Sequence, residues 1–376
     1  MSEIHYEVFR RVGAKGGWTL HEVVTSRDRA VAMARELMAG EKATGVKVVK
    51  ETYNDETGDF LTLKIFEDGH NQVKIAPAQK DAPHALPCFK PDDLYSYHAR
   101  QTMSRLLTDF LARNTVTITE LIHRADLLEK LEATGTLYQH AIQKVAVAQA
   151  ASTAAGVQQI VKSLNELTTQ AFHRVYRDQR RGLFPDPHPE QFGELAQTLG
   201  RQGDAAYIFN GALARHLKGA KGWDEKVLML ITIMESPPPP EDGARKLVLS
   251  SVDAILAEIL GGSAALHDLM GPAENLGQAM NNLVTLFLGK EAQAGGRGLA
   301  ALTHHFAADD LPEARTAIAS RIIAEFKSNK RLCPDFMVEE LKTLRAMANR
   351  IVLGIGKYLS HEDLIAAFTL RSKRLV

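Results

Sequence analysis

The chain has 376 residues, 45% of them hydrophobic, so it is long enough for two or three domains that each bury a core, and disorder of the whole chain is excluded. Lys plus Arg (45) equals Asp plus Glu (45), so no net charge attracts nucleic acid or an anionic membrane. The two cysteines, Cys88 and Cys333, lie far apart without Cys or His neighbours at metal-ligand spacing, which argues against a disulfide scaffold and a zinc site.

No segment of the sequence indicates a membrane or secreted location. The N-terminal residues MSEIHYEVFRRVGAK lack the basic and then apolar pattern of a secretory signal. No run approaches the ~18 consecutive apolar residues that a membrane-spanning helix needs. Together with the sparse cysteines, these features predict a soluble protein of the reducing cytoplasm without membrane contact.

The first 70 residues predict a small α+β module. Two runs rich in aromatic and β-branched residues, IHYEVFRRV and WTLHEVV, flank a glycine-rich turn and are typical of a hairpin. Apolar residues then share one helical face over 26–39, with Ser26 as the N-cap and Gly40 as the stop. A second hairpin is predicted over 47–69, with Gly58 in its turn. This order of elements predicts a four-stranded antiparallel sheet with one helix against it.

The predicted sheet has one face that its helix does not cover. Alternation along the third strand places Lys47, Val49 and Glu51 on one side of the strand and Val46 and Val48 on the other. The uncovered face is either solvated, as in many antiparallel sheets, or a recognition surface. Addition of a partner strand to an edge of the sheet is a third interpretation.

A proline-rich linker separates this module from the rest of the chain. Four prolines there interrupt both helical and sheet hydrogen bonding: Pro77, Pro83, Pro87 and Pro91. The sequence beyond the linker predicts only helices. The predicted divisions are a module at 1–70, a linker at 71–91, a helical hairpin or coiled-coil-like segment at 92–182, and an all-α domain at 188–376.

The segment 92–182 carries the strongest local helix signal. Thr117 followed by Glu120 matches a capping box, and an apolar stripe continues from Ile118 to Leu131. A second pattern, over 140–171, repeats apolar residues at intervals of three and four and predicts a helical seam. That seam either packs in a hairpin within the chain or forms a homodimer, and the preceding apolar helix favours the hairpin.

The segment 188–376 predicts an all-α domain of seven or eight helices, separated by glycine, proline and N-capping aspartate. No convincing self-similarity at 34 or 40 residues is present, so the sequence does not indicate a helical-repeat solenoid. The predicted fold class is therefore mainly α, with a small ββαββ module at the N-terminus.

One histidine segment of this domain resembles a phosphoryl acceptor. ALARHLKGAKGW, around His216, resembles the phosphorylatable helix of histidine-phosphotransfer domains, in which lysine and glycine follow the histidine by three and four residues. Here Lys218 and Gly219 come one residue too early, so they project from a different part of the helix. A basic helix end that terminates at glycine is the favoured interpretation.

A second histidine segment supplies the enzymatic alternative. SAALHDLMG, around His267 and Asp268, resembles the His-Asp doublet of HD-type metal phosphohydrolases, which are also all-helical. The resemblance implies that an upstream histidine, the doublet and a distant aspartate hold one or two metal ions that activate water. His216 and either Asp309 or Asp310 would complete this set, although His216 lies farther upstream than that family usually places its histidine.

No other segment carries a defined catalytic, cofactor or metal pattern, so the catalytic residues are unknown and neither a cofactor nor a metal is expected. The arginines after the seam fit a cationic helix end better than a surface for RNA or an acidic partner: Arg174, Arg177, Arg180 and Arg181. Nucleic acid is not expected as a partner. These features favour a non-enzymatic intracellular regulatory or scaffolding protein that acts through protein contacts, with an HD-type phosphohydrolase as the alternative.

Overall fold

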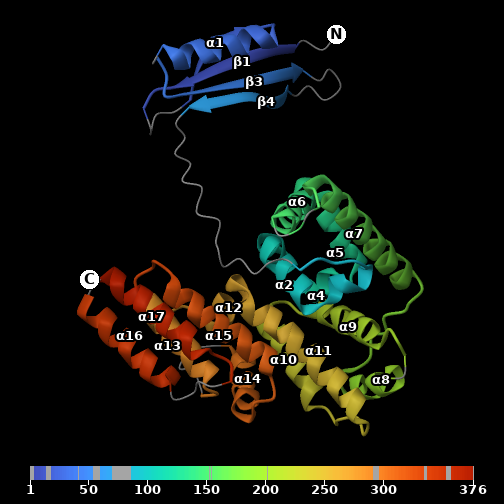
Figure 1. The fold of residues 1–376 in the computed structure, drawn as a ribbon. Coiled ribbons are helices and arrows are strands. Elements are labelled where there is room, and N and C mark those ends of the chain that lie inside the picture. Colours follow the sequence, from blue (N-terminus) through green and yellow to red (C-terminus); the bar gives the residue numbers. More distant parts are fainter. Residues whose placement is uncertain are drawn as a thin grey trace. The chain divides into compact units, whose positions relative to one another are not determined.

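In the computed structural model of the chain, the described residues are 4–13, 18–40, 42–53, 60–69, 86–151, 153, 155–200, 202–290, 296–333, 337–352 and 357–375. The chain divides into two compact units, Met1–Pro83 and His84–Val376. The first contains a small antiparallel sheet with one helix, and the regular elements of the second are helices throughout its described residues (Figure 1). The predicted mainly-α fold with an N-terminal α+β module is therefore confirmed.

The first unit contains the five elements that the sequence predicts, in the same order: β1 (Ile4–Arg11), β2 (Thr19–Val24), α1 (Arg27–Ala39), β3 (Gly45–Tyr53) and β4 (Phe60–Gly69). The strand order is β2-β1-β3-β4, and all pairs are antiparallel. Helix α1 covers one face of the sheet (Figure 1). Its Ala30 and Ala34 pack with Val8, Val46 and Val48, all of which are fully buried.

The ends of α1 and the hairpin turn differ in detail from expectation. Ser26 has the extended backbone of an N-cap, but its side chain accepts no capping hydrogen bond. Gly40 ends the helix at φ −86°, so the stop does not use the left-handed conformation that glycine favours. Gly58, predicted to lie in the β3–β4 turn, is outside the described residues.

Both edge strands of the sheet carry a bulge. The pairing of β1 with β2 passes from Val8–Glu22 to Phe9–Leu20 and leaves out His21. The β3–β4 pairing leaves out Ile65 in the same way. A bulge interrupts the ladder and increases the local twist, which is a common means of preventing strand addition at an edge. The outer sheet face, and not an edge, is therefore the better candidate for a contact surface in this unit.

The first helices of the second unit are short and end in a long hairpin. In chain order they are the 3₁₀-helix η1 (Pro91–Tyr95), α2 (Tyr97–Leu106), α3 (Thr108–Asn114), α4 (Ile118–Leu121), α5 (Ala125–Ala133), α6 (Thr136–Ala150) and α7 (Val157–Arg180). The capping box is confirmed, because Glu120 N donates to Thr117 Oγ1 at 3.2 Å and Thr117 N donates to Glu120 Oε2 at 2.9 Å. The apolar stripe after it forms two helices, since Arg124 has an extended backbone and starts α5.

The predicted seam at 140–171 is used within the chain. Its pattern is interrupted after Ala150, and α7 starts again behind Gly156, which acts as its N-cap. Helices α6 and α7 then form a hairpin, in which Ile142 and Ala146 pack with Leu164. The hairpin therefore covers part of both apolar faces within the chain, and a dimer through this segment stays a prediction.

The remaining helices form the largest core. They are η2 (Pro189–Gln191), α8 (Phe192–Leu199), α9 (Ala205–His216), η3 (Leu217–Gly219), α10 (Trp223–Glu235), α11 (Asp242–Gly261), α12 (Ser263–Met270), α13 (Leu276–Phe287), α14 (Arg297–Ala308), α15 (Pro312–Lys327), α16 (Met337–Val352) and α17 (His361–Leu375). The pattern missed α12 and α14, because α12 follows α11 directly with a bend of 87° and α14 is rich in alanine and histidine. No single helix among the described residues is long and apolar enough to cross a membrane; α11 and α12 reach the length only together, across that bend.

Candidate functional site

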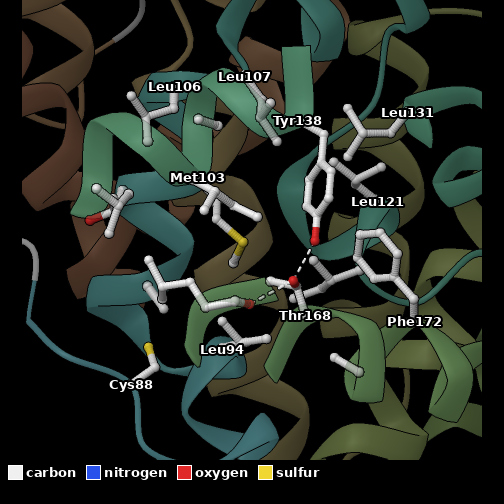
Figure 2. Close-up of a pocket in the computed structure, with 18 of the residues that line it drawn as sticks. Cys88, Leu94, Met103, Leu106, Leu107, Leu121, Leu131, Tyr138, Thr168 and Phe172 are labelled. Atoms are coloured by element: carbon white, nitrogen blue, oxygen red, sulfur yellow. Dashed lines mark hydrogen bonds between the residues drawn. The ribbon is translucent and has the colours of Figure 1, made fainter. Parts of the chain in front are cut away.

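An apolar cavity of about 110 Å³ lies between α2, α4, α5, α6 and α7 (Figure 2). A single water needs only about 10–15 Å³ of such a space. Leu106, Leu107 and Leu131 line one region, and Leu86 and Cys88 line another. Almost all of the lining surface is carbon, so the cavity suits an apolar occupant better than water.

Small side chains on the hairpin helices leave this space open. Ala141 of α6 and Ala171 of α7 line the cavity, and Ala99 of α2 joins them. Each stands where a leucine or isoleucine would fill a helix–helix gap in an ordinary core. The cavity therefore follows from the choice of alanine at these positions.

The cavity contains one polar pair. Figure 2 shows the hydroxyl of Tyr138 pointing at the hydroxyl of Thr168, to which it is hydrogen-bonded. The Thr168 hydroxyl also lies 2.7 Å from the carbonyl oxygen of Leu164, to which it donates. Burial raises the pKa of Tyr138, so the phenol stays protonated at neutral pH. This pair could orient a ligand that has a hydroxyl or carbonyl group, whereas most of the remaining lining surface is apolar.

The chain segment before η1 borders the cavity. Gln149 Nε2 of α6 donates to the carbonyl oxygen of Leu86 at 3.3 Å. The Asp93 carboxylate accepts from Phe89 N at 2.8 Å and from Lys90 N at 3.2 Å, and these hydrogen bonds hold its pKa below the usual value. Burial, with the nearby charge of Asp93, raises the pKa of the Cys88 thiol. Cys88 is therefore a protonated, weakly nucleophilic wall of the cavity.

Buried ion pairs join α2 and α4 to the large core. Lys226 Nζ of α10 lies 2.6 Å from both carboxylate oxygens of Glu120, and both side chains are almost completely buried. Glu258 of α11 accepts from Thr119 N at 2.9 Å, from Thr119 Oγ1 at 2.8 Å and from Arg100 at 2.8 Å. Burial raises the pKa of Glu258 and lowers that of Lys226. Every charge here has its partner, so the cluster is a structural clamp without an open position for a substrate.

A neutral histidine lies beside this clamp. His123 Nδ1 is 2.7 Å from the carbonyl oxygen of Thr119, and the ring packs among Tyr95, Phe184 and Tyr207. Complete burial lowers the pKa of His123 to about 4. At neutral pH the ring is therefore uncharged and serves as part of an aromatic cluster.

The residues proposed from the HD-type resemblance do not come together. His267 and Asp268 are exposed on α12, whereas His216 ends α9 with its ring 5.4 Å from that of Phe192. Asp309 follows α14 and bonds to Lys357. No group of three or more His, Cys, Asp or Glu side chains in the described part of the chain could hold a metal ion.

Two further sequence candidates have intramolecular partners. Asp310 lies 3.4 Å from His305. Arg174 pairs with Asp92 at 2.6 Å and with Asp204 at 3.1 Å, and its guanidinium lies 3.9 Å from the ring centroid of Tyr207. Arg174 is therefore a structural residue and not an exposed contact for an acidic partner.

Sequence patterns did not indicate the cavity. Its walls come from five helices and from residues as far apart as Leu86 and Val175, and the same apolar residues would also fit a closed core. Alanines at intervals of four in α6, such as Ala146 and Ala150, were the only related signal, and they predict close helix packing.

Comparisons with protein-family models, with curated proteins and with solved structures found no match to the chain.

Proposed function

We propose that this chain is a non-enzymatic, intracellular regulatory protein whose helical unit binds the aliphatic chain of a small molecule in the cavity between α2 and α7. The second part of this proposal is that the N-terminal module contacts a protein partner. Two free thiols, Cys88 and Cys333, support a reducing compartment. The phosphohydrolase alternative lacks a metal-ligand group among the described residues, and no observation favours it.

The cavity is the observation that carries this proposal. Protein interiors are normally packed like organic crystals, and each Å³ left empty costs about 24 cal/mol. An unfilled space of this size therefore costs about 2–3 kcal/mol, which is a large fraction of the stability of an ordinary domain. Substitution of a single alanine, such as Ala141 or Ala171, by leucine would remove most of that cost. The presence of alanine at these positions, which leaves the cavity open in spite of this cost, supports a binding role for the cavity.

The lining selects the class of ligand. Nearly continuous carbon surface favours a saturated chain or a small ring, because each buried CH₂ contributes about 0.8 kcal/mol. Among the described residues no charged side chain lines the space, so an ion or a polar metabolite would lose its hydration without replacement. Any charged head group of the ligand must stay outside the cavity.

Binding of a short straight-chain alcohol, such as hexanol, to the full chain tests the proposal, because a cavity of about 110 Å³ has room for only a few carbon atoms. The expected result is a saturable heat of binding, which Ala141→Leu and Ala171→Leu each weaken at least tenfold. Ala148→Leu provides the matched control, since Ala148 is exposed on the same helix as Ala141; it should bind like the wild type. Circular dichroism of each variant verifies that the fold is retained. Absence of saturable binding, or unchanged binding in both cavity variants, would refute the proposal.

A specific observation also favours a contact role for the N-terminal module. Leu20 and Val23 of β2 are 51% and 47% exposed. Both pair with outward-facing residues of β1, namely Phe9 and Glu7. The grouping of these two exposed apolar side chains on one sheet face supports a contact role for that face.

A further inference from the structure

The outer face of the N-terminal sheet has an apolar centre. Phe9 of β1 and Val49 of β3 point away from α1, because their strand neighbours Val8 and Val48 pack against the helix. Leu20 and Val23 extend this surface onto β2, and both are about half exposed. The surface is defined here as the outer face, and it also includes Trp18, which lies beside β2.

Charges on the outer face are separated along the strands. Glu7 and Glu51 lie toward one end, where Glu51 pairs with His5 across β1 and β3. Lys47 and Arg11 lie toward the other end. Lys47 Nζ is 4.6 Å from the ring centroid of Phe9 and 5.2 Å from that of Trp18, and the Arg11 guanidinium is 5.1 Å from Trp18. The outer face therefore has an acidic end, an apolar middle and a basic end.

The edge strand β4 adds no net charge to this arrangement. Lys64 and Glu67 point to the same side and form an ion pair at 2.7 Å. The outer face as a whole is thus close to neutral but strongly bipolar. Nucleic acid is a poor fit, because Glu7 and Glu51 would repel phosphates over half of the surface. A complementary partner must be neutral and bipolar as well.

We propose that the outer face binds the same face of a second copy of this chain, across a two-fold axis that lies between the two sheets and runs across the strands. Such an axis reverses the strand direction and brings the acidic end of each copy over the basic end of the other. Val49 is already buried within one copy, so the apolar surface that the dimer covers is mainly that of Leu20 and Val23. Bulges on both edge strands disfavour the alternative, in which two sheets pair edge to edge.

The size of the face sets the expected affinity. Four strands spaced about 4.8 Å apart, each about eight residues long at about 3.3 Å per residue, present roughly 500 Å². Two such faces bury roughly 1,000 Å², just below the range of about 1,200–2,000 Å² for stable interfaces. We therefore expect a reversible dimer with a dissociation constant in the micromolar range or weaker. This inference rests on the proposed contact role of the module and is independent of the cavity.

Sedimentation velocity of the full chain, over concentrations from about 1 to 300 μM, tests the inference. The wild type should shift from monomer to dimer as its concentration rises. Glu7→Lys places a lysine beside Glu51 and cancels the charge of the acidic end, and Lys47→Glu places a glutamate beside Arg11 and cancels the charge of the basic end. Each variant alone should therefore associate at least tenfold more weakly. An equimolar mixture of the two variants should form a 1:1 dimer, because their faces are again complementary.

Two controls separate this interface from others. The double variant Arg29→Glu with Glu22→Arg swaps an ion pair on the helix side of the sheet, away from the outer face, so it should dimerise like the wild type. Val147→Glu alters a valine that is 58% exposed on α6 and should also have no effect. A wild type that stays monomeric would overturn the inference. So would unaffected Glu7→Lys and Lys47→Glu variants, failure of the mixture to associate, or loss of the dimer in Val147→Glu. None of these results would change the expected binding of an aliphatic chain in the cavity.

Discussion

The two parts of the helical unit fill their interiors in different ways. In the core of α8 to α17, large aromatic side chains are completely buried: Phe192, Phe209, Phe287, Phe306 and Phe326. Between α2 and α7, alanines line a space of about 110 Å³ that holds no side chain. Both parts belong to the same compact unit, so the open space cannot be ascribed to poor packing of the chain in general. This difference in packing is the one that the proposed binding of an aliphatic chain requires.

The buried clamp between these two parts should give the largest effect. Lys226→Met leaves the buried Glu120 carboxylate with only Arg124, 3.4 Å away, as a cation. We expect a loss of about 3 kcal/mol in the free energy of unfolding, the lower end of the usual range of about 3–5 kcal/mol for breaking a buried pair. Chemical denaturation measures this loss. The double variant Lys226→Met with Glu120→Gln removes both charges and should recover part of the stability. A loss below about 1 kcal/mol in the single variant would mean that the pair does not join the two parts.

The next largest effect that we expect is a pH dependence of the free energy of unfolding, which His123 causes. Its pKa of about 4 in the folded chain is below the ordinary value of 6.5. Between these pH values the unfolded chain takes up a proton that the folded chain excludes, so stability is complete above pH 6.5 and falls as the pH approaches 4. The loss should reach about 3 kcal/mol at most. Denaturation midpoints of the wild type and His123→Gln over this range provide the measurement, and equal slopes would contradict the assignment.

On the cavity side, Leu164→Ala should cost less than a typical core truncation. Leu164 is buried but lines the open space, so part of its surface lacks packing partners. We expect a loss of about 2–3 kcal/mol, the lower part of the usual range of about 2–5 kcal/mol. Leu213→Ala, in the filled core, is the matched comparison and should cost more. If Leu164→Ala loses as much unfolding free energy as Leu213→Ala, or more, the two parts do not differ in packing as described above.

The smallest expected effect concerns the polar pair in the cavity. Tyr138→Phe removes one hydrogen bond to Thr168 and should lower stability by about 1 kcal/mol. Binding of a chain without polar groups should stay unchanged, whereas a ligand with a hydroxyl group should bind more weakly. Titration of the variant with a matched alkane and alcohol distinguishes the two cases. Equal weakening of both ligands would show that the pair only supports the wall.

The sequence predicted elements well where local physics decides them. Period-two and helical patterns predicted the ββαββ module, and the capping box at Thr117 and Glu120 forms as expected. Local patterns failed where distant contacts decide. At the break between α4 and α5, the His123 ring is hydrogen-bonded to the carbonyl oxygen of Thr119. The side chains of Glu120 and Glu258 find their partners in segments more than a hundred residues away in the sequence. The candidate site was not predictable, because an alanine that leaves a space looks in sequence like one that permits close packing.

Isothermal titration of the full chain with straight-chain alcohols of increasing length tests the central claim most directly. The account predicts saturable binding at one site, with affinity that rises about fourfold per CH₂ until the cavity is full and then levels off. Ala141→Leu should shift that plateau to a shorter chain, because it removes volume from the same space. Absence of saturable heat at every length, or an identical plateau in Ala141→Leu, would contradict the claim that this cavity is a binding site.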